Sequence, residues 1–127
     1  MLFIKIGIAF CMLAVVIGAF GAHGLENVIG NKMDTFKTGV QYHMFHGLAL
    51  IVTGILSKVF EIDVSIAGYL FIMGIILFSG SLYLISIYDK YSFLGMITPI
   101  GGLSFIMAWA LLLYKVGNLF FVSEVLL

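Results

Sequence analysis

The sequence predicts an all-α integral membrane protein, a single domain (residues 1–127) built as a bundle of four transmembrane helices. Hydrophobic residues make up 63% of the chain and charged residues 9%, whereas a soluble domain is about 45–50% apolar and about 25% charged. The charged residues leave four uncharged windows, 6–25, 38–57, 64–88 and 91–114. Each window reaches the roughly 20 residues that a helix needs to cross about 30 Å of hydrocarbon. Because their apolarity is continuous rather than alternating, the windows favour helices over barrel strands.

The four spans follow from these windows and from the charged residues that flank them. Residues 58–63 join the second span to the third, and residues 89–91 join the third to the fourth. Such short links require antiparallel neighbours. We expect the spans at approximately 4–23, 38–58, 64–88 and 92–115.

The first link, from His23 to Lys37, is longer and mixed in polarity. We expect it to form an amphipathic surface segment. Asn31, with Asp34 three residues later, can cap a helix that enters the membrane from this segment.

Pro99 lies inside the fourth window and lacks the N–H that would bond to the carbonyl of Gly95. Two interpretations are open. Either the fourth helix kinks at Pro99, or it begins at Thr98–Pro99 with Thr98 as its cap.

The start of the chain, with Lys5, an apolar stretch and small residues from Ala19 to Ala22, is also compatible with a signal peptide. We expect this segment to be retained as the first span, and the other three spans hold the chain in the membrane in either case. The positive-inside rule gives no orientation. The lysines divide equally between the two sides: Lys5, Lys58 and Lys115 against Lys32, Lys37 and Lys90.

Small residues recur every seven positions along the spans. Helices in lipid associate where small residues allow close backbone approach, and a seven-residue repeat predicts near-parallel, left-handed packing. The sequence therefore predicts a packing seam made of Gly7, Ala14, Gly21, Gly47, Gly54, Ala67, Gly74, Ser81, Gly101 and Ala108.

Side chains that can form hydrogen bonds collect in one half of the predicted bundle. His23 ends the first span and His43 and His46 begin the second, so the antiparallel connection places all three in one leaflet. The third span returns to this leaflet and the fourth leaves from it, and both bring hydroxyl groups. Gln41 points about 160° away from His43 at 100° per residue. The candidate pocket comprises His23, Gln41, Tyr42, His43, His46, Ser79, Tyr83 and Thr98.

Two interpretations of this polar half are open. Polar groups in a membrane need partners and usually face the bundle interior or a wet cavity, and histidine titrates near neutral pH, which favours a functional pocket. In the structural interpretation, the same residues lie at the headgroup boundary and only join the helices. Trp109 and Tyr114 are interpreted as packing and interface anchors.

Several classes of function are excluded or unsupported. Equal numbers of Lys and acidic residues, with no Arg, exclude nucleic acid as a partner. The single cysteine, Cys11, can form neither a disulfide framework nor a Cys-based metal site. His43 and His46 are spaced i, i+3 and can reach one ion, with His23 as a third ligand, but no intramembrane carboxylate completes the shell. We therefore predict no metal or other cofactor. No Ser/His/Asp set, paired carboxylates or phosphate-binding loop is visible, so we expect no enzyme.

Four motifs resemble those of a known family. They are Gly18–Leu25 (GAFGAHGL), Phe36–His46 (FKTGVQYHMFH), Leu77–Tyr83 (LFSGSLY) and Thr98–Gly102 (TPIGG). In this order, and over almost the whole chain, they are similar to the YgdD/YwdK-like small membrane proteins, catalogued as domain of unknown function 423. The resemblance implies a multi-pass protein of the bacterial inner membrane without an established activity. It also implies motif positions at His23, Tyr42 and His46, with Gln41 beside them.

The leading hypothesis for function is a non-enzymatic membrane protein whose His/Tyr pocket binds or passes a small solute or a proton. The alternative is an interaction protein whose polar half docks a partner subunit or lipid headgroups. In either case the bilayer is the main partner, and the glycine-lined faces allow a homo-oligomer.

Overall fold

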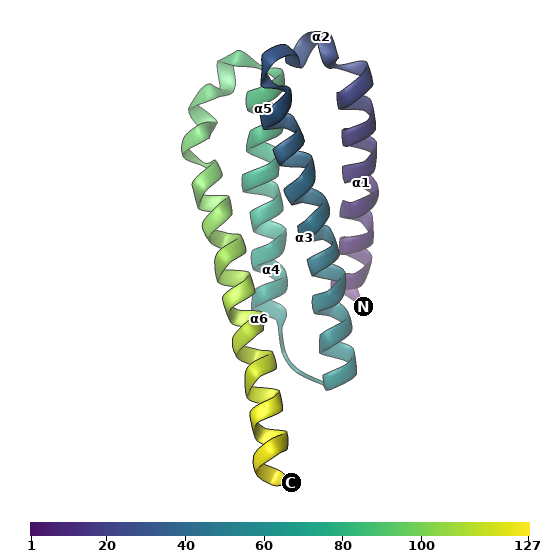
Figure 1. Cartoon of the computed structure of the whole chain (residues 1–127), viewed down its shortest axis with the longest axis vertical. Helices are drawn as coiled ribbons and strands as arrows, with labels where there is room; N and C mark the ends of the chain where they lie inside the picture. The colour runs from purple at the N-terminus through teal and green to yellow at the C-terminus, as the bar shows by residue number, and fades with distance from the viewer.

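The computed structural model describes residues 1–127 as an array of helices without strands (Figure 1). In chain order its elements are α1 (Leu2–Gly24), α2 (Glu26–Ile29), η1 (Gly30–Lys32), α3 (Met33–Phe60), α4 (Ser65–Gly74), η2 (Ile75–Ser79), α5 (Gly80–Ile87), η3 (Asp89–Met96) and α6 (Thr98–Leu126). Four stretches are long and apolar enough to cross a membrane: Leu2–Gly24, Glu26–Phe60, Ser65–Ile87 and Thr98–Leu126. The prediction of an all-α protein with four membrane-spanning helices is confirmed.

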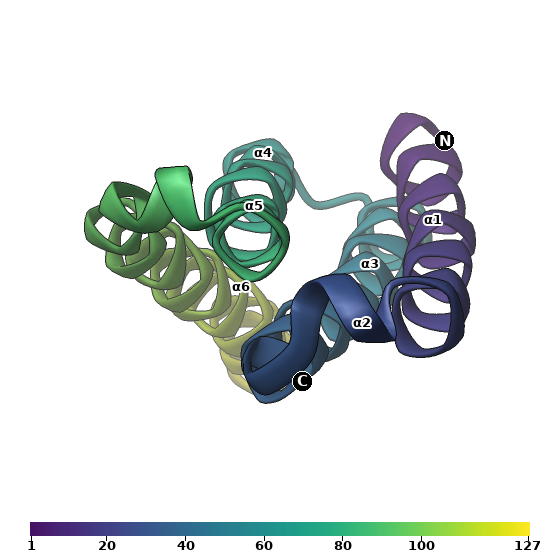
Figure 2. The ribbon, with the colours of Figure 1, turned by 90° about the horizontal axis from the view of Figure 1, so that it is seen from above.

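The long helices form two pairs, α1 with α3 and α4 with α6, and α3 makes the contacts between the pairs. Helix α1 packs against α3, and α6 packs against α4 and η2, while α3 also contacts α4, η2 and α5. Seen from above, α1 and α6 lie at opposite ends of the array (Figure 2). Both end helices therefore present much of their surface to the surroundings of the bundle.

Small residues make the closest contacts within each pair. A Cβ atom at Gly7 would lie 2.8 Å from the carbonyl oxygen of Gly47 on α3, and a Cβ atom at Gly101 on α6 would meet the backbone of Phe78. The buried residues of α1 are the three that the sequence places seven apart: Gly7, Ala14 and Gly21. The predicted seam is thus confirmed for α1, and these helices approach too closely for a larger side chain.

The link between α1 and α3 is helical along almost its whole length (Figure 1). Gly30 has a φ of 56°, which glycine adopts without steric cost, and it turns the chain from α2 into η1. Lys32 occupies the cap position of α3, and no side chain caps that helix. The expectation that Asn31 with Asp34 forms the cap is wrong, because η1 continues directly into α3.

The third span is not a uniform α-helix. Its middle, η2, is a π-helical turn, a local widening that is frequent at functional sites. The turn shifts the register between α4 and α5, so residues before and after it do not follow one 3.6-residue repeat.

The fourth helix begins at Thr98 rather than at residue 92, because Asp89–Met96 forms the 3₁₀ segment η3. The structure therefore realises the second interpretation of Pro99, a helix start. The missing N–H of proline falls in the first turn, where it has no helical partner. Ile97 is the cap residue, and the Thr98 hydroxyl donates to the Leu94 carbonyl oxygen instead of capping the helix.

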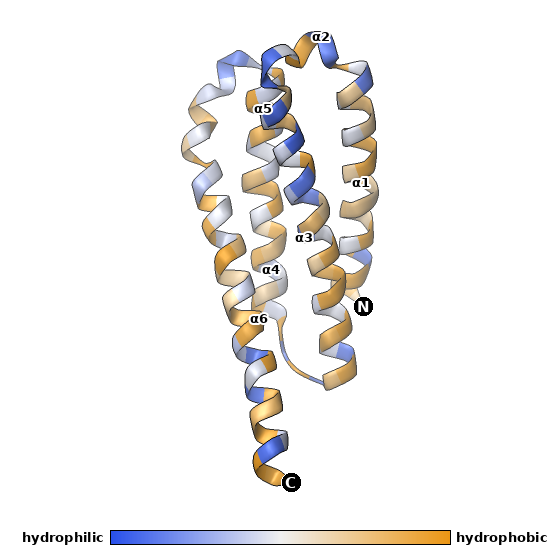
Figure 3. Ribbon diagram, in the orientation of Figure 1, coloured by the Kyte–Doolittle hydropathy of each residue, from blue (hydrophilic) through white to orange (hydrophobic).

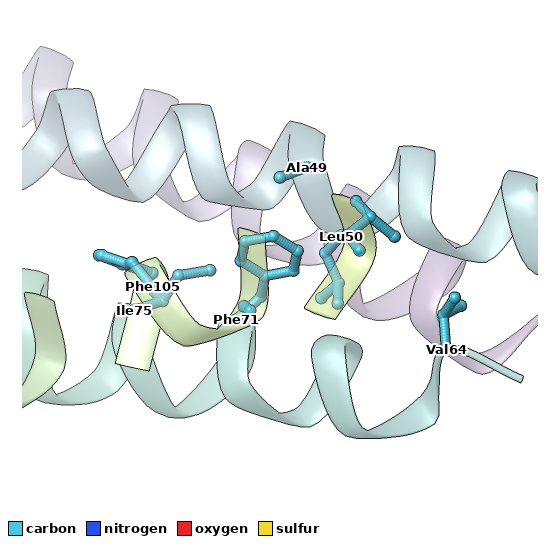
Figure 4. Packing of buried hydrophobic residues seen from close by; sticks show 8 residues of the cluster. Ala49, Leu50, Val64, Phe71, Ile75 and Phe105 are labelled. Carbon is cyan, nitrogen blue, oxygen red and sulfur yellow. The ribbon is translucent and has the colours of Figure 1, made fainter. Parts of the chain in front are cut away.

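The buried apolar core lies between α3, α4, η2 and α6 (Figure 4). It comprises Ala49, Leu50, Val64, Phe71, Ile75, Phe105, Ala108 and Leu112. Hydrophilic residues gather around α2, the start of α3 and η3 (Figure 3). The outward faces of the end helices are apolar and exposed, as at Met12 on α1 and Leu113 on α6, which suits lipid rather than water as their solvent.

Candidate functional site

His46 on α3 is held in one tautomer by two hydrogen bonds. Its Nδ1 lies 2.7 Å from the carbonyl oxygen of Tyr42, which can only accept, so Nδ1 carries the proton. Its Nε2 lies 3.2 Å from the indole Nε1 of Trp109 on α6, which can only donate, so Nε2 accepts. His46 is therefore a buried, neutral ring with both nitrogens engaged, and it joins α3 to α6.

Nearly parallel aromatic rings surround His46. The Phe105 ring stacks on the imidazole with centroids 3.5 Å apart and planes at 12°. The Tyr42 ring lies 5.8 Å from the imidazole at 16° and 4.7 Å from the Phe78 ring. Ring pairs with centroids about 4.5–7 Å apart attract each other beyond the effect of area burial, which applies to the contacts of Tyr42 with His46 and Phe78. The cluster therefore holds its shape through packing as well as hydrogen bonds.

A groove of about 700 Å³ runs between α3 and α6 over these rings. Leu103 and Ile106 on its α6 side are 56% and 66% exposed, so the groove opens sideways on the outer surface of the bundle. Tyr42 takes part in side-chain hydrogen bonding only through its backbone carbonyl, which leaves its hydroxyl without a partner in the chain. The groove is lined by Tyr42, His46, Phe78, Pro99, Gly102, Leu103, Phe105, Ile106 and Trp109.

His43 faces a different side of α3. Its Nδ1 lies 2.8 Å from the hydroxyl of Tyr83 on α5, and its ring meets the edge of Phe10 on α1 with centroids 5.6 Å apart. Gly39 allows the Tyr83 ring to lie close to α3, since a Cβ there would be 3.0 Å from that ring. The other nitrogen of His43, Nε2, is buried without a hydrogen-bond partner. The pair therefore ties α3 to α5 through one hydrogen bond in the interior.

The serine and threonine residues of the third and fourth spans differ in their hydrogen bonding. Ser81 and Thr98 lie 2.6 Å apart, oxygen to oxygen, and join α5 to the start of α6. Ser79, in the π-helical turn, is fully buried, and its hydroxyl has no partner. The Ser81–Thr98 contact connects two helices. None of the residues Ser79, Ser81 and Thr98 lines the groove.

Two predicted residues, His23 and Gln41, lie outside this cluster. Both are exposed, and neither forms a side-chain hydrogen bond with the other predicted residues. His23 follows Gly21 by two residues and is therefore turned about 200° from the face of α1 that packs on α3. Gln41 is turned away from His43 in the same manner. The structure does not bring these two residues together with the other predicted residues.

One ion pair lies at the polar end of the bundle. Lys32, in η1, pairs with Asp89 at the start of η3 and also donates to the carbonyl oxygen of Ile85. The hydrogen bond and the positive charge of Lys32 hold the pKa of the exposed Asp89 carboxyl below its ordinary value. This contact links the two connections that lie on the same side of the membrane.

Of the nine residues that line the groove, sequence reasoning placed only Tyr42 and His46 in the candidate site. The seven that it missed include Phe105 and Trp109, which contact His46 directly. Trp109 was interpreted as an anchor, yet it donates to His46 and lines the groove. A signal was available, because Gly102, Phe105 and Trp109 are spaced by three and four residues and therefore share one face of a helix. No group of three or more His, Cys, Asp or Glu side chains lies close enough to hold a metal ion.

The fold and the polar cluster define a class, a small multi-pass membrane protein with a lateral aromatic groove. Residues 17–102 match the family model described as "Protein of unknown function (DUF423)". The chain belongs to this family, as its motifs suggested. No specific activity is established for the family.

The relatives that the chain is similar to are named as membrane proteins of bacteria. The chain is 50% identical over 113 residues to the UPF0382 membrane protein YwdK of Bacillus subtilis, covering 87% of this chain and 91% of the relative. It is 46% identical over 113 residues to a UPF0382 membrane protein of Staphylococcus haemolyticus, covering 88% and 92%. A third, from Staphylococcus epidermidis, is 46% identical over 111 residues, covering 87% and 90%. No solved structure matches the chain. The protein is thus a bacterial multi-pass membrane protein.

Proposed function

We propose that this protein is a non-enzymatic binding protein that holds a small, bilayer-dissolved molecule in the groove between α3 and α6. The observation that carries the proposal is the groove itself, about 700 Å³ in volume, within the range typical of small-molecule sites. It combines aromatic walls with one free polar group, the Tyr42 hydroxyl. Such a combination provides affinity through apolar burial and orientation through one hydrogen bond.

Binding is favoured over passage of a proton or an ion. Both nitrogens of His46 are engaged with groups of fixed role, so the ring has no free site for a mobile proton. The groove lining contains no carboxylate or lysine. A charged solute would therefore enter an apolar surface without a counter-charge, which is costly in a membrane.

The test uses Trp109, the single tryptophan of the chain, as a reporter inside the groove. The protein is reconstituted in nanodiscs and its fluorescence is titrated with bromobenzene, a small apolar quencher. A site gives quenching that saturates, whereas random encounters in the bilayer give quenching that rises linearly. We expect saturation for the wild-type chain, and linear quenching alone would contradict the proposal.

Two matched variants distinguish binding in the groove from quenching by molecules dissolved in the bilayer. A Cβ at Gly102 would lie 3.7 Å from the Phe78 ring, an ordinary contact, and Gly102 lines the groove, so Gly102→Leu adds a side chain that fills the groove. Gly117, on the same helix, has no atom within 4 Å of an added Cβ. Saturation should disappear in Gly102→Leu and persist in Gly117→Leu.

A second candidate function, docking of a second copy of the chain or another subunit, is favoured by the end of α6. This end projects beyond the rest of the bundle (Figure 1) and exposes apolar side chains, Phe121 at 67% and Val125 at 68%. Exposed apolar patches mark interaction sites. Native mass spectrometry of the extracted protein should then show a dimer or a stoichiometric partner, and a monomer alone would contradict it.

A further inference from the structure

We infer that the molecule held in the groove is a neutral, planar, carbonyl-bearing ring compound with an apolar tail, of the quinone type. This inference rests on the proposed function and names the chemical class of its ligand. Four observations of the groove carry it: the parallel rings, the unpaired hydroxyl, the absence of charge and the sideways opening.

The first observation concerns shape. The ring of Tyr42 lies nearly parallel to those of His46 and Phe105, with interplanar angles of 16° and 28°. Of the rings that line the groove, those of Tyr42 and Trp109 are 39% and 46% exposed, whereas His46 and Phe105 are buried behind them. A flat ring compound gains stacking energy on the exposed faces that a flexible chain does not. The groove therefore favours a planar headgroup over a straight acyl chain.

The second observation concerns hydrogen bonding. Tyr42 is 39% exposed, and its hydroxyl has no hydrogen-bond partner in the chain, so the hydroxyl is free to bond to a molecule in the groove. The imidazole of His46 is already occupied by Trp109 and by the Tyr42 carbonyl oxygen. The free group is thus a phenol O–H, which donates readily to a carbonyl oxygen.

The third observation concerns charge. The lining holds no lysine, and His46 is neutral in its bonded tautomer. A carboxylate or phosphate headgroup would find no cation in the groove, so a fatty acid or a phospholipid headgroup fits poorly. A neutral carbonyl avoids this cost.

The fourth observation concerns access. Leu103 and Ile106 are exposed at the mouth of the groove, so the route into it leads from the bilayer. An apolar tail attached to the ring would lie along these two side chains and continue into lipid. The ligand therefore enters sideways, and its tail stays in the membrane.

The test compares three probes by quenching of Trp109 in nanodiscs. They are a 1,4-naphthoquinone with a short isoprenoid tail, a brominated straight-chain alcohol of similar length, and bromobenzene. The quinone should saturate at a concentration about tenfold lower than the alcohol, because only the quinone stacks on the rings. Equal or tighter binding of the alcohol would overturn the inference.

The variant Tyr42→Phe keeps the ring and removes the hydroxyl. It should weaken quinone binding about fivefold, the effect of one lost hydrogen bond, and leave bromobenzene binding unchanged, since bromobenzene accepts no such bond. Tyr114→Phe, an exposed position outside the groove, is the control and should change neither. Quinone binding that is insensitive to Tyr42→Phe would also overturn the inference.

The three probes distinguish the proposed function, which is binding of a small molecule in the groove, from the inferred class of its ligand. Saturation by bromobenzene without saturation by the quinone leaves the proposed function standing and overturns the ligand class. Absence of saturation with every probe overturns both. Circular dichroism and a single peak in size-exclusion chromatography establish that each variant is folded. The smaller change Gly102→Ala fills the groove less than Gly102→Leu and provides an intermediate case.

Discussion

The indole Nε1 of Trp109 donates a hydrogen bond of 3.2 Å to Nε2 of His46, and this bond connects the two walls of the groove. Helices α3 and α6 are separated in the chain by the span Ser65–Ile87 and by η3, and α6 packs chiefly on α4 and η2. The Trp109–His46 bond thus adds a hydrogen bond to the stacking of Phe105 on His46 and to the apolar core that α3 and α6 share. Together with the Tyr42 carbonyl oxygen, Trp109 fixes the proton of His46 on Nδ1.

The tautomer of His46 is the first testable consequence. With Trp109 donating to Nε2 and the Tyr42 carbonyl accepting from Nδ1, nitrogen-15 NMR should show a neutral His46 with its proton on Nδ1. Trp109→Phe should leave the proton on Nδ1, because the Tyr42 carbonyl oxygen still accepts it, and should destabilise the protein by about 1 kcal/mol. A proton found on Nε2 in the wild-type chain would show that the bond does not form.

The His43–Tyr83 pair gives a second prediction, about stability. Tyr83→Phe removes the partner of a buried nitrogen, which should lower the free energy of unfolding by about 1–3 kcal/mol. Tyr69→Phe is a matched control, because Tyr69 is 57% exposed and forms no side-chain hydrogen bond. A double-mutant cycle with His43→Leu measures the coupling, which we expect at about 0.5–3 kcal/mol. A coupling of zero would mean that the two side chains do not interact.

The glycine seam gives a third prediction. Gly7→Ala places a methyl group 2.8 Å from the Gly47 carbonyl oxygen and 2.9 Å from the Ile51 nitrogen, so α1 and α3 must separate. The expected loss of unfolding free energy is about 1–3 kcal/mol. Gly24→Ala, where an added Cβ has no neighbour within 4 Å, should stay within about 0.5 kcal/mol of the wild type. Equal stability of the two variants in a detergent unfolding assay would argue against this packing.

A fourth prediction concerns pH. The pKa of Asp89 lies below its ordinary value of 3.8 because Lys32 donates a hydrogen bond to it and carries the opposite charge. A lowered pKa in the folded state means that the contribution to stability is present above about pH 3.8 and is lost as the pH falls through the folded value. Asp63, whose pKa is lowered mainly by a hydrogen bond from the Ser65 hydroxyl, adds to the same acid dependence.

Thermal unfolding of Asp89→Asn against the wild type isolates the Lys32–Asp89 pair. The wild type should have the higher Tm at pH 6, and the difference should shrink at pH 3. The difference should be small, because the pair is largely exposed. Glu124→Gln removes an exposed carboxylate without an ion pair and should keep the wild-type pH dependence. A Tm difference that persists at pH 3 would exclude the ion pair as its source.

Local sequence patterns were sufficient to predict the helices and their closest contacts. Uncharged windows locate the spans, and the seven-residue spacing of Gly7, Ala14 and Gly21 identifies the packing face of α1, because both depend only on residues within one helix. The short links then place the polar residues in one half of the bundle. His46 and Tyr42 were found in this way.

The groove itself could not be predicted, because it depends on how α6 is rotated relative to α3. The 3₁₀ segment η3 delays the start of α6 to Thr98, and the π-helical turn η2 changes the register of the helix on which α6 packs. Each residue of offset rotates a helical face by about 100°. The pairing of Trp109 with His46 follows from these rotations rather than from spacing within one helix. The separation of His23 from the cluster follows instead from its two-residue spacing from Gly21 on α1.

The central claim is that a small molecule occupies the groove over Tyr42, Phe105 and Trp109. The most direct measurement is X-ray diffraction from crystals grown in a lipidic phase and soaked with bromobenzene, with the bromine located by its anomalous signal. We predict one strong bromine peak between the Tyr42 and Trp109 rings in the wild-type protein and none at that place in Gly102→Leu. Bromine found only among the lipids around the bundle, with the groove empty in both proteins, would contradict the claim.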